Sequence, residues 1–285
     1  MDNKYVVVTG VSSGIGAGIA RDLVAHGYKV FGSVRKKTDG CHLQEQLGDA
    51  FVPLQFDVTD RKAIMDAVQL VNDIVGGQGL AGLVNNAGVS VSGPLMHLPV
   101  DEVRWLFEVN VLGAISVTQA FLPLLGAREP ATHPPGRIVN IGSVSGVVAV
   151  PFMGAYAGTK HALEAVTQAF RRELTVYGIE ACVIEPGFIR TEMFEKEMAQ
   201  SPDVRFADTG FGAMWRAFHR SISEAEKTAA DVEVVAAAVR RALSSKKPKT
   251  RYGLDPLCWL GRLLPDRQFD RLVFKAMGLD KALHG

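Results

Sequence analysis

The stretch Val6-Val7-Val8-Thr9-Gly10-Val11-Ser12-Ser13-Gly14-Ile15-Gly16 decides the fold of this 285-residue chain. The apolar, β-branched run Tyr5–Val8 suits a buried parallel strand. Ala17–Ala25 then places apolar residues at helical spacing, so the expected order is strand, glycine turn and helix. That geometry aims free backbone N–H groups and a helix N-terminus at one point, which suits a pyrophosphate. The glycines permit the tight turn and let a phosphate approach the backbone.

The glycine spacing, Gly-x3-Gly-x-Gly, differs from the general dinucleotide fingerprint Gly-x-Gly-x-x-Gly. On the glycines alone, an ordinary strand-to-helix turn is the alternative. The pattern from Thr9 to Gly16 nevertheless resembles the cofactor loop of the short-chain dehydrogenase/reductase family. The resemblance implies that an NAD(P) cofactor is bound by Gly10, Ser12, Ser13, Gly14, Ile15 and Gly16.

Segments of strand and helix character alternate along the chain. Further strands are expected at Lys29–Ser33, Phe51–Phe56, Gly82–Val84, Arg137–Ile141 and Ile179–Ile184, and helices at Arg61–Val75, Val100–Leu125, Gly154–Tyr177 and Asp231–Leu243. The alternation predicts an α/β fold, a Rossmann-like doubly wound parallel sheet between two helical layers. The length suits a single domain over residues 1–285. Ligands of such sheets bind outside the carboxyl ends of the strands.

Composition excludes some classes of function. A formal net charge of +1 offers no electrostatic argument for nucleic acid. Cys41, Cys182 and Cys258 are odd in number and far apart, so neither a metal site nor a disulfide framework is expected, and a reducing, cytoplasmic location is favoured. The first strand begins too early to leave room for a signal peptide. No apolar run is expected to approach the ~18 residues of a membrane span.

A basic residue follows the second expected strand. An acidic residue at this point would hydrogen-bond the ribose 2′-hydroxyl and favour NAD, and Val34 cannot do so. Arg35 can pair with a 2′-phosphate through its planar guanidinium, and Lys36 and Lys37 add positive charge. NADP is therefore expected in preference to NAD, and a solvated basic turn is the alternative.

Two more loops follow strands and match the family. In the family, the residue at the position of Asp57 contacts the adenine ring, and Val58 lies beside it. The alternative is that Asp57 caps the next helix, although Thr59 or Asp60 would serve as that cap. The run Asn85–Gly88 is a family hallmark, in which the first asparagine ties strands together and the second lies near the adenosine ribose. The resemblance thus adds to the cofactor site Asp57, Val58, Asn86, Ala87 and Gly88.

A polar amide, Asn110, interrupts the apolar segment Val100–Leu125. Burying an amide without partners costs about 1–3 kcal/mol, so its presence needs a reason. A core asparagine with satisfied hydrogen bonds is one explanation. The family resemblance implies another, because the matching asparagine holds a water that links the catalytic lysine to solvent.

The strongest signal is Ser143, after the fifth strand, followed by Tyr156-Ala157-Gly158-Thr159-Lys160. Tyr156 and Lys160 are four residues apart and project from one helix face. A free tyrosine has a pKa of about 10, and a neighbouring ammonium favours the phenolate and lowers that pKa. Ser143 can donate a hydrogen bond to a substrate oxygen and steady the charge that forms there.

Together with the glycine loop, these residues imply the family's reaction. A hydride passes between the nicotinamide and a secondary alcohol or ketone (or alcohol and aldehyde), and Tyr156 acts as acid or base. Lys160 is also placed to hydrogen-bond the nicotinamide ribose. The implied catalytic residues are Asn110, Ser143, Tyr156 and Lys160.

The loop Pro186–Thr191 follows the sixth strand. In the family this loop covers the nicotinamide, where the Ile189 backbone and the Thr191 hydroxyl bind the carboxamide. The resemblance, which spans roughly residues 5–245, completes the cofactor set with Tyr156, Lys160, Pro186, Gly187, Ile189 and Thr191.

Residues 188–228 are expected to form a helical substrate lid. The large apolar side chains between Glu192 and Ala225 are Met193, Phe194, Met198, Phe206, Phe211, Met214, Trp215 and Phe218. Such a lid can close over an apolar, bulky alcohol or ketone, or these residues can simply pack it on the body. Three short runs, Gly32–Arg35, Gly93–Leu95 and Val150–Phe152, resemble the branch with 17β-hydroxysteroid and retinol dehydrogenases, which implies a steroid-like, retinoid-like or other lipophilic substrate.

Residues 252–285 form a C-terminal extension that mixes apolar and basic side chains. Pro265 is expected to break it into two short helices. One interpretation is a basic amphipathic surface that touches a membrane or gates the pocket. A helical cover packed on its own subunit or on a partner is favoured.

More apolar residues than one sheet face needs are found in two expected helices, Val100–Leu125 and Gly154–Tyr177. The matching helices of the family form an interface, so a homodimer or homotetramer is expected.

Two other activities are alternatives to the dehydrogenase. A nucleotide-sugar epimerase can share Tyr-x3-Lys, but resembles a longer fold with Gly-x2-Gly-x2-Gly. A redox-sensing module that holds NADP without turnover typically lacks the catalytic tyrosine or lysine, and both are present here.

Overall fold

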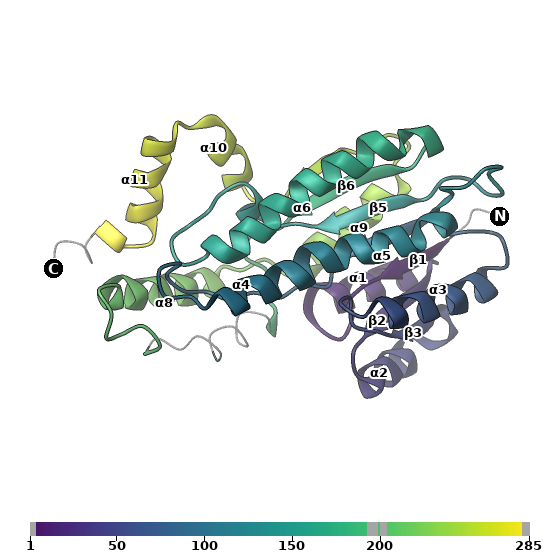
Figure 1. Cartoon of the computed structure of the whole chain (residues 1–285), viewed down its shortest axis with the longest axis horizontal. Coiled ribbons are helices and arrows are strands. Elements are labelled where there is room, and N and C mark those ends of the chain that lie inside the picture. Colours follow the sequence, from purple (N-terminus) through teal and green to yellow (C-terminus); the bar gives the residue numbers. More distant parts are fainter. Residues whose placement is uncertain (1–3, 193–198, 200–203, 281–285) are drawn as a thin grey trace.

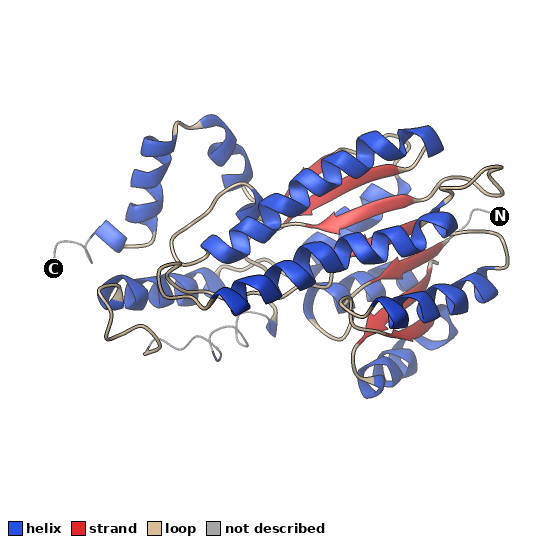
Figure 2. Cartoon of the chain, in the orientation of Figure 1, coloured by secondary structure: helices blue, strands red, loops and turns tan. Residues whose placement is uncertain are grey.

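A seven-stranded parallel sheet lies between two layers of helices in a computed structural model that describes residues 4–192, 199 and 204–280 (Figures 1 and 2). The strand order is β3-β2-β1-β4-β5-β6-β7. The order reverses between β1 and β4, and ligands of doubly wound sheets bind in the crevice outside the carboxyl ends at such a reversal. The predicted α/β fold with a doubly wound sheet is confirmed.

The strands are short and largely buried, because helices cover both faces of the sheet. They are β1 (Tyr5–Val8), β2 (Lys29–Val34), β3 (Phe51–Gln55), β4 (Gly82–Asn85), β5 (Arg137–Ile141), β6 (Glu180–Glu185) and β7 (Arg251–Gly253). Six of them agree with the sequence expectation to within one residue at either end. β7, which pairs with β6 at the sheet edge, was not expected, because three residues without a β-branched side chain carry no strand pattern.

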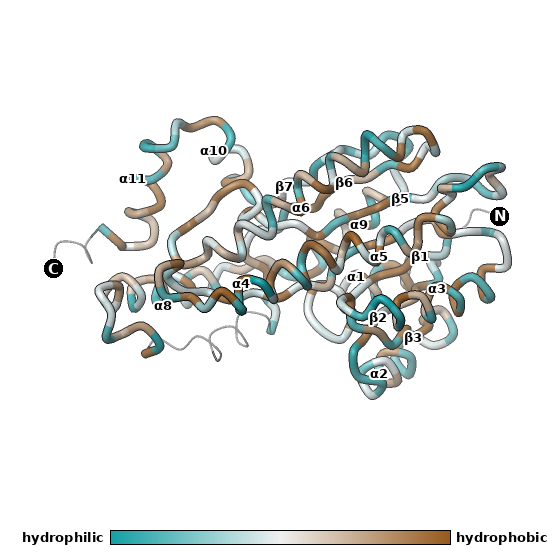
Figure 3. Tube along the Cα trace, viewed as in Figure 1, coloured by the Kyte–Doolittle hydropathy of each residue, from teal (hydrophilic) through white to brown (hydrophobic). Residues whose placement is uncertain are grey.

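Alternation along each strand sends side chains to opposite layers, as Val6 and Val8 pack on one face and Val7 on the other. Figure 3 shows the apolar segments that run along β1 and β5. The first face is covered by α1 (Gly14–Ala25), α2 (Lys37–Leu47) and α9 (Val232–Ser244). The second is covered by α3 (Arg61–Val75), α5 (Ala114–Phe121) and α6 (Gly154–Glu173). The helix α2 was not expected, because little of it is apolar.

The segment Val100–Leu125 is one long helical run made of α4 (Val100–Phe107), a π-helical segment (Glu108–Gly113), α5 and a 3₁₀ turn. Contrary to the sequence expectation, its length and its mean hydropathy of 1.4 over 18 residues are sufficient for a membrane span. However, 56% of that window is buried inside the fold. Core packing therefore accounts for its apolar character.

Three helices project beyond the carboxyl end of the sheet (Figure 1): α8 (Gly212–Lys227), α10 (Leu257–Leu263) and α11 (Asp266–Ala276). Pro265 separates α10 from α11, as predicted. In the view of Figure 1, α10 and α11 together form an arch that lies above α8.

An aromatic cluster fixes the described part of the lid to the body. Trp215 and Phe218 of α8 are fully buried and stack with their centroids 5.3 Å apart, while Phe152 meets both edge-on. Phe206 packs on Trp215, and Leu279 beyond α11 joins the same cluster. Packing on the body is thus the role of Phe206 and Trp215. Met193, Phe194 and Met198 lie outside the described residues.

Candidate active site

A cleft of about 910 Å³ runs along the carboxyl ends of the strands. Its lining contains every residue predicted to bind the cofactor, from Gly10 to Thr191, together with Ser143. Among the predicted site residues, only Asn110 lies outside the lining. Side chains that are far apart in the sequence therefore meet at one edge of the sheet, as the parallel topology requires.

A threonine holds the glycine loop against the end of β4. Thr9 Oγ1 accepts hydrogen bonds from the backbone N–H groups of Asn86 and Ala87, both at 2.9 Å. Asn86 Nδ2 in turn donates to the carbonyl oxygens of Thr9 and Gly10 at 2.9 and 3.0 Å. A Cβ on Gly16 would stand 2.2 Å from the Gly10 oxygen, so only glycine fits there. Asn86 thus braces the loop with its amide, and Thr9, the first residue of the motif, does so with its hydroxyl, a role that was not predicted for it.

The N-terminus of α1 is open toward the cleft. Its N-cap, Ser13, makes no side-chain capping bond, and the first N–H groups of a helix have no acceptor within the helix. Gly10 and Gly14 turn the chain there with φ values of +69° and +56°, which glycine adopts without strain. The cradle therefore fits a pyrophosphate, which accepts hydrogen bonds from such N–H groups.

The cleft is also lined by a cation at the end of β2, next to the strand end that the glycine loop contacts. Arg35, exposed at the end of β2, lines the cleft and makes no ion pair with any carboxylate that the structure describes. Asp60, not Asp57, caps α3, because its carboxylate accepts from the Ala63 N–H at 3.0 Å. Asp57 instead accepts from the N–H and the hydroxyl of Thr59. The capping interpretation of Asp57 is therefore wrong.

The helix α6 presents Tyr156 and Lys160 to the cleft on successive turns. Lys160 Nζ lies 5.6 Å from the centroid of the Tyr156 ring and donates a hydrogen bond to the Ile141 oxygen at 2.9 Å. Only 6% of Lys160 is exposed, and this burial lowers the pKa of its ammonium to about 8. The charge is therefore largely present at neutral pH and is lost just above it.

Ser143 lies where the chain leaves β5. Its Oγ accepts a hydrogen bond from the Ser145 N–H at 3.1 Å, which leaves the hydroxyl proton available for a substrate oxygen. The neighbouring Val144 N–H donates to the Pro186 oxygen at 2.7 Å. That bond ties the serine loop to the loop expected to cover the nicotinamide.

The π-helical segment places Asn110 inside the fold, and such segments are frequent at functional sites. Asn110 Oδ1 accepts from the Val89 N–H at 2.8 Å, and Nδ2 donates to the Val89 oxygen and to Thr159 Oγ1 at 2.9 and 3.0 Å. The side chain is thus a satisfied core amide that fastens α6 next to Lys160. Its part in a water-mediated proton relay stays a prediction.

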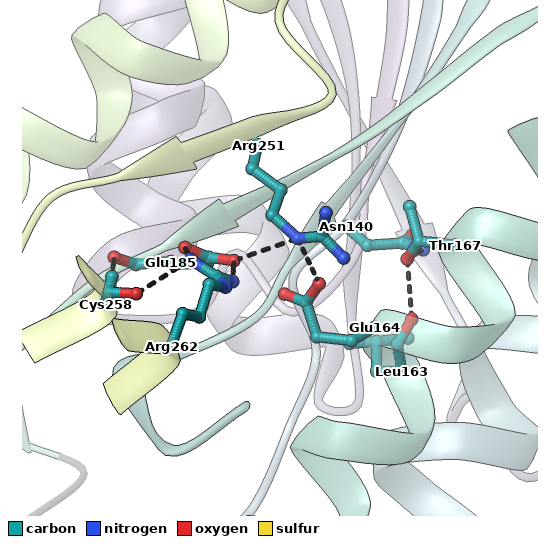
Figure 4. A network of polar contacts seen from close by, with 8 residues as sticks. All are labelled: Asn140, Leu163, Glu164, Thr167, Glu185, Arg251, Cys258 and Arg262. Atoms are coloured by element: carbon teal, nitrogen blue, oxygen red, sulfur yellow. Dashed lines mark hydrogen bonds and ion pairs between the residues drawn. The ribbon is translucent and has the colours of Figure 1, made fainter. Parts of the chain in front are cut away.

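Two buried carboxylates and two partly exposed arginines form a network of ion pairs (Figure 4). Glu185, fully buried at the end of β6, pairs with Arg262 of α10 at 2.5 Å and with Arg251 of β7 at 3.4 Å. Arg251 also pairs with Glu164 of α6 at 2.9 Å. Burial, and then the charge of Glu185, raise the pKa of Glu164 to about 7. The network joins the helix that carries Lys160, the strand that precedes Pro186, and the C-terminal extension.

The C-terminal helices form one wall of the cleft. Their lining side chains are Leu257, Leu260, Phe269, Leu272, Val273, Ala276 and Met277. The lid helix α8 contributes Phe218, Ser221, Ile222 and Ala225. The extension thus covers the cleft of its own chain, whereas contact with a membrane stays a prediction. No motif in the sequence singled out these lining positions.

A profile of the short chain dehydrogenase family matches residues 4–202. The chain belongs to the short-chain dehydrogenase family. It is therefore an oxidoreductase that acts on CH–OH groups, and the cleft with Ser143, Tyr156 and Lys160 is the place in this short-chain dehydrogenase where that chemistry fits.

Two curated relatives match over most of their length. The NADPH-dependent 3-dehydrocapnine reductase of Ornithobacterium rhinotracheale is 42% identical over 276 residues, which cover 95% of this chain and 96% of that protein. Retinol dehydrogenase 16 of Homo sapiens is 33% identical over 275 residues, which cover 92% of this chain and 83% of that protein. The predicted resemblance to the retinol dehydrogenase branch is confirmed.

A solved structure shares the whole architecture. A short-chain dehydrogenase from Streptomyces avermitilis aligns with a TM-score of 0.75 at 28% identity, and the match covers 100% of this chain and 98% of that chain. The seven-stranded sheet and its C-terminal helices therefore have a counterpart in a member of the same family.

Replacing Lys160 with methionine should remove one pH dependence of folding. A lysine whose pKa falls from 10.5 to about 8 on folding destabilises the fold below pH 8, and this penalty disappears as the pH rises to about 10.5. Wild type should therefore gain on the order of 3 kcal/mol in free energy of unfolding, relative to Lys160→Met, as the pH rises across that window. Urea unfolding of the cofactor-free proteins measures it.

Lys246→Met is the matched control, because Lys246 is exposed. The free energy of unfolding of Lys246→Met should differ from that of wild type by the same amount throughout this pH window. If the difference between Lys160→Met and wild type were also independent of pH, the buried ammonium would be contradicted.

Proposed function

We propose that this short-chain dehydrogenase interconverts a secondary alcohol and a ketone, or an alcohol and an aldehyde, on an apolar substrate with NADP as cofactor. The observation that carries the proposal is the convergence of Ser143, Tyr156 and Lys160 with the glycine loop on one cleft. Two curated relatives, named as an NADPH-dependent reductase and a retinol dehydrogenase, support it. A redox-sensing module without turnover is the alternative, and the intact tyrosine and lysine argue against it.

The choice of NADP over NAD rests on Arg35 and on the NADPH dependence in the name of the 42% identical relative. The N-terminus of α1 would hold the pyrophosphate, and Arg35 the 2′-phosphate. Asp57 and Val58 would lie at the adenine, and the loop Pro186–Thr191 at the nicotinamide. The bound cofactor supplies or accepts the hydride.

The protein's own groups handle the oxygen and the proton. The Ser143 hydroxyl donates to the substrate oxygen and stabilises negative charge on it during reduction. Tyr156 gives its hydroxyl proton to that oxygen in reduction and takes a proton from the alcohol in oxidation. The Lys160 ammonium, held beside the ring by the Ile141 oxygen, stabilises the phenolate that remains.

An apolar substrate is supported by the lining beyond the cofactor residues. Side chains of α8, α10 and α11 meet there, and most of them are aliphatic or aromatic. Burying apolar surface against them favours binding by roughly 25 cal/mol per Å² removed from water. Steroid-like, retinoid-like and aliphatic alcohols or ketones all present such surface.

Tyr156→Phe should lower turnover by about 10²–10⁴-fold, because the variant keeps the ring and loses the proton donor. Absorbance of reduced nicotinamide, followed with a panel of steroids, retinoids and aliphatic alcohols and ketones, measures the loss. Titration of NADPH should show that cofactor binding is retained. Tyr177→Phe, at an exposed position that does not line the cleft, is the control. Unchanged turnover in Tyr156→Phe would defeat the proposed acid.

Arg35→Ala should weaken NADPH binding about tenfold to a hundredfold and NADH binding much less. The reason is the loss of charge-assisted hydrogen bonds, worth about 1.5–3 kcal/mol, which only the 2′-phosphate can make. Dissociation constants for both cofactors measure the difference, with the exposed Arg61→Ala as matched control. An equal loss for the two cofactors would contradict the role of Arg35.

We further propose a homodimer or homotetramer built on the α4–α5 segment and α6, located in the cytoplasm. Exposed apolar side chains on and before that segment support the assembly: Leu95, Met96, Val100, Trp105, Phe107 and Leu112. The cytoplasmic location is supported by the three cysteines, all of which are free thiols.

Light scattering at micromolar concentration should give two or four times the monomer mass. Leu112→Lys should shift the protein toward monomer, because a buried unpaired ammonium opposes association. Leu263→Lys, on an exposed residue of α10, should leave the mass unchanged. A monomeric wild type would refute the proposed assembly.

A further inference from the structure

The arch of α10 and α11 lines the cleft but has little buried surface of its own. No residue within α11 is buried, and Cys258 is the only buried residue of α10. Phe269, Val273 and Ala276 line the cleft at intervals of four and three residues, so they form one apolar stripe along α11. A helix in a protein is held mainly by the packing of its apolar face. With so little packing, the arch depends on the points at which it is attached to the body.

The attachment of α10 is an ion pair with a buried carboxylate (Figure 4). Arg262 Nη2 donates to Glu185 Oε1 at 2.5 Å, and Nη1 donates to Oε2 at 3.4 Å and to the Cys258 oxygen at 2.9 Å. Glu185 is fully buried, and its other cation, Arg251, lies 3.4 Å away. A guanidinium that binds both carboxylate oxygens fixes orientation as well as distance. The pair therefore sets where α10 lies.

Close packing beside this pair places α10 next to the serine loop. A Cβ on Gly261, directly before Arg262, would stand 2.4 Å from the Val148 side chain. Val148 lines the cleft five residues after Ser143. Glycine permits this approach because it has no side chain. Leu260, the residue before Gly261, lines the cleft itself, so the attached part of α10 is also part of the apolar wall.

The far end of the arch is attached to the lid. Leu279, which follows α11, is fully buried in the aromatic cluster that contains Trp215 and Phe218 of α8. The stripe of α11 thus lies between two fixed points, the Arg262 pair and Leu279. A change at either point would move the stripe relative to the groups that react.

We infer that Arg262 is a positioning residue for the substrate, because its ion pair with Glu185 holds α10 and α11 where their apolar stripe contacts a bound substrate. The inference rests on the proposed function and assigns a role in it to a residue outside the cofactor and proton chemistry. Apolar carbons of the substrate that reach the stripe gain binding energy only while the stripe is held against them.

Arg262→Met tests the pair, since it keeps the aliphatic stem and removes the guanidinium. The probes are straight-chain methyl ketones of increasing length. In wild type, kcat/KM should rise roughly twofold to fourfold for each methylene that reaches the wall. In the variant most of this rise should disappear through KM, while kcat, the kcat/KM of the shortest ketone and the dissociation constant of NADPH change little. A loss of folded enzyme alone would lower all the ketones equally and leave the rise intact.

Two further variants separate the pair from the charge that it leaves behind. Arg262→Lys keeps a cation and should restore part of the rise, but less than arginine, because an ammonium cannot bind both carboxylate oxygens in the same way. Arg262→Met together with Glu185→Gln removes both charges, so no unpaired carboxylate is buried. The double variant should fold and show the same reduced rise as Arg262→Met.

Arg267→Met is the matched control, because Arg267 is exposed on α11 and does not line the cleft. Its dependence on chain length should equal that of wild type. The same dependence in Arg262→Met, or no dependence in wild type, would overturn the inference while the proposed reductase stands. Weaker NADPH binding with an unchanged dependence would also overturn it, and would assign the pair to the cofactor loop that begins at Pro186. Turnover of no carbonyl compound at all would refute the proposed function itself.

Discussion

A hydrogen bond from a buried ammonium to a backbone carbonyl holds this site together. Lys160 Nζ and the Ile141 oxygen join the middle of α6 to the last residue of β5, beside the loop that begins with Ser143. An ammonium on a buried residue is unfavourable, and its lowered pKa records that penalty. The proposed chemistry uses a positive charge next to the Tyr156 ring, which gives a reason for a buried lysine at this position.

The remaining contacts at this edge of the sheet keep separate loops in register. Thr9 and Asn86 lock the glycine loop to β4, and Val144 locks the serine loop to Pro186. The Glu185 network extends the same frame to the substrate wall through Arg262. Each brace ties a strand end to a neighbouring loop or helix, so the cofactor half and the substrate half of the cleft share one frame.

Local patterns explain how much of the site could be predicted from the sequence. The turn at Gly10–Gly16 and the pair Tyr156 and Lys160 are each written within a few residues, and six strands carry a buried apolar run. Contacts across the chain leave no such pattern. The bond between Asn86 and Gly10, and the pairing of Glu185 with Arg262, each join segments dozens of residues apart.

Other features could not be predicted from the sequence, because the residue types present fit more than one structure. The strand β7 is too short to show a period, and large apolar residues of the lid read equally well as core or as pocket. The structure separates the two for α8, where Trp215 is core and Phe218 also lines the cleft.

The arch of α10 and α11 is drawn from one uninterrupted piece of chain, whereas the cofactor half is assembled from the ends of many strands. Changes in this terminal piece therefore alter the apolar wall of the cleft without altering the residues that line its cofactor half. Any replacement of the piece would have to keep a guanidinium for Glu185, since that carboxylate would otherwise lose its nearest partner.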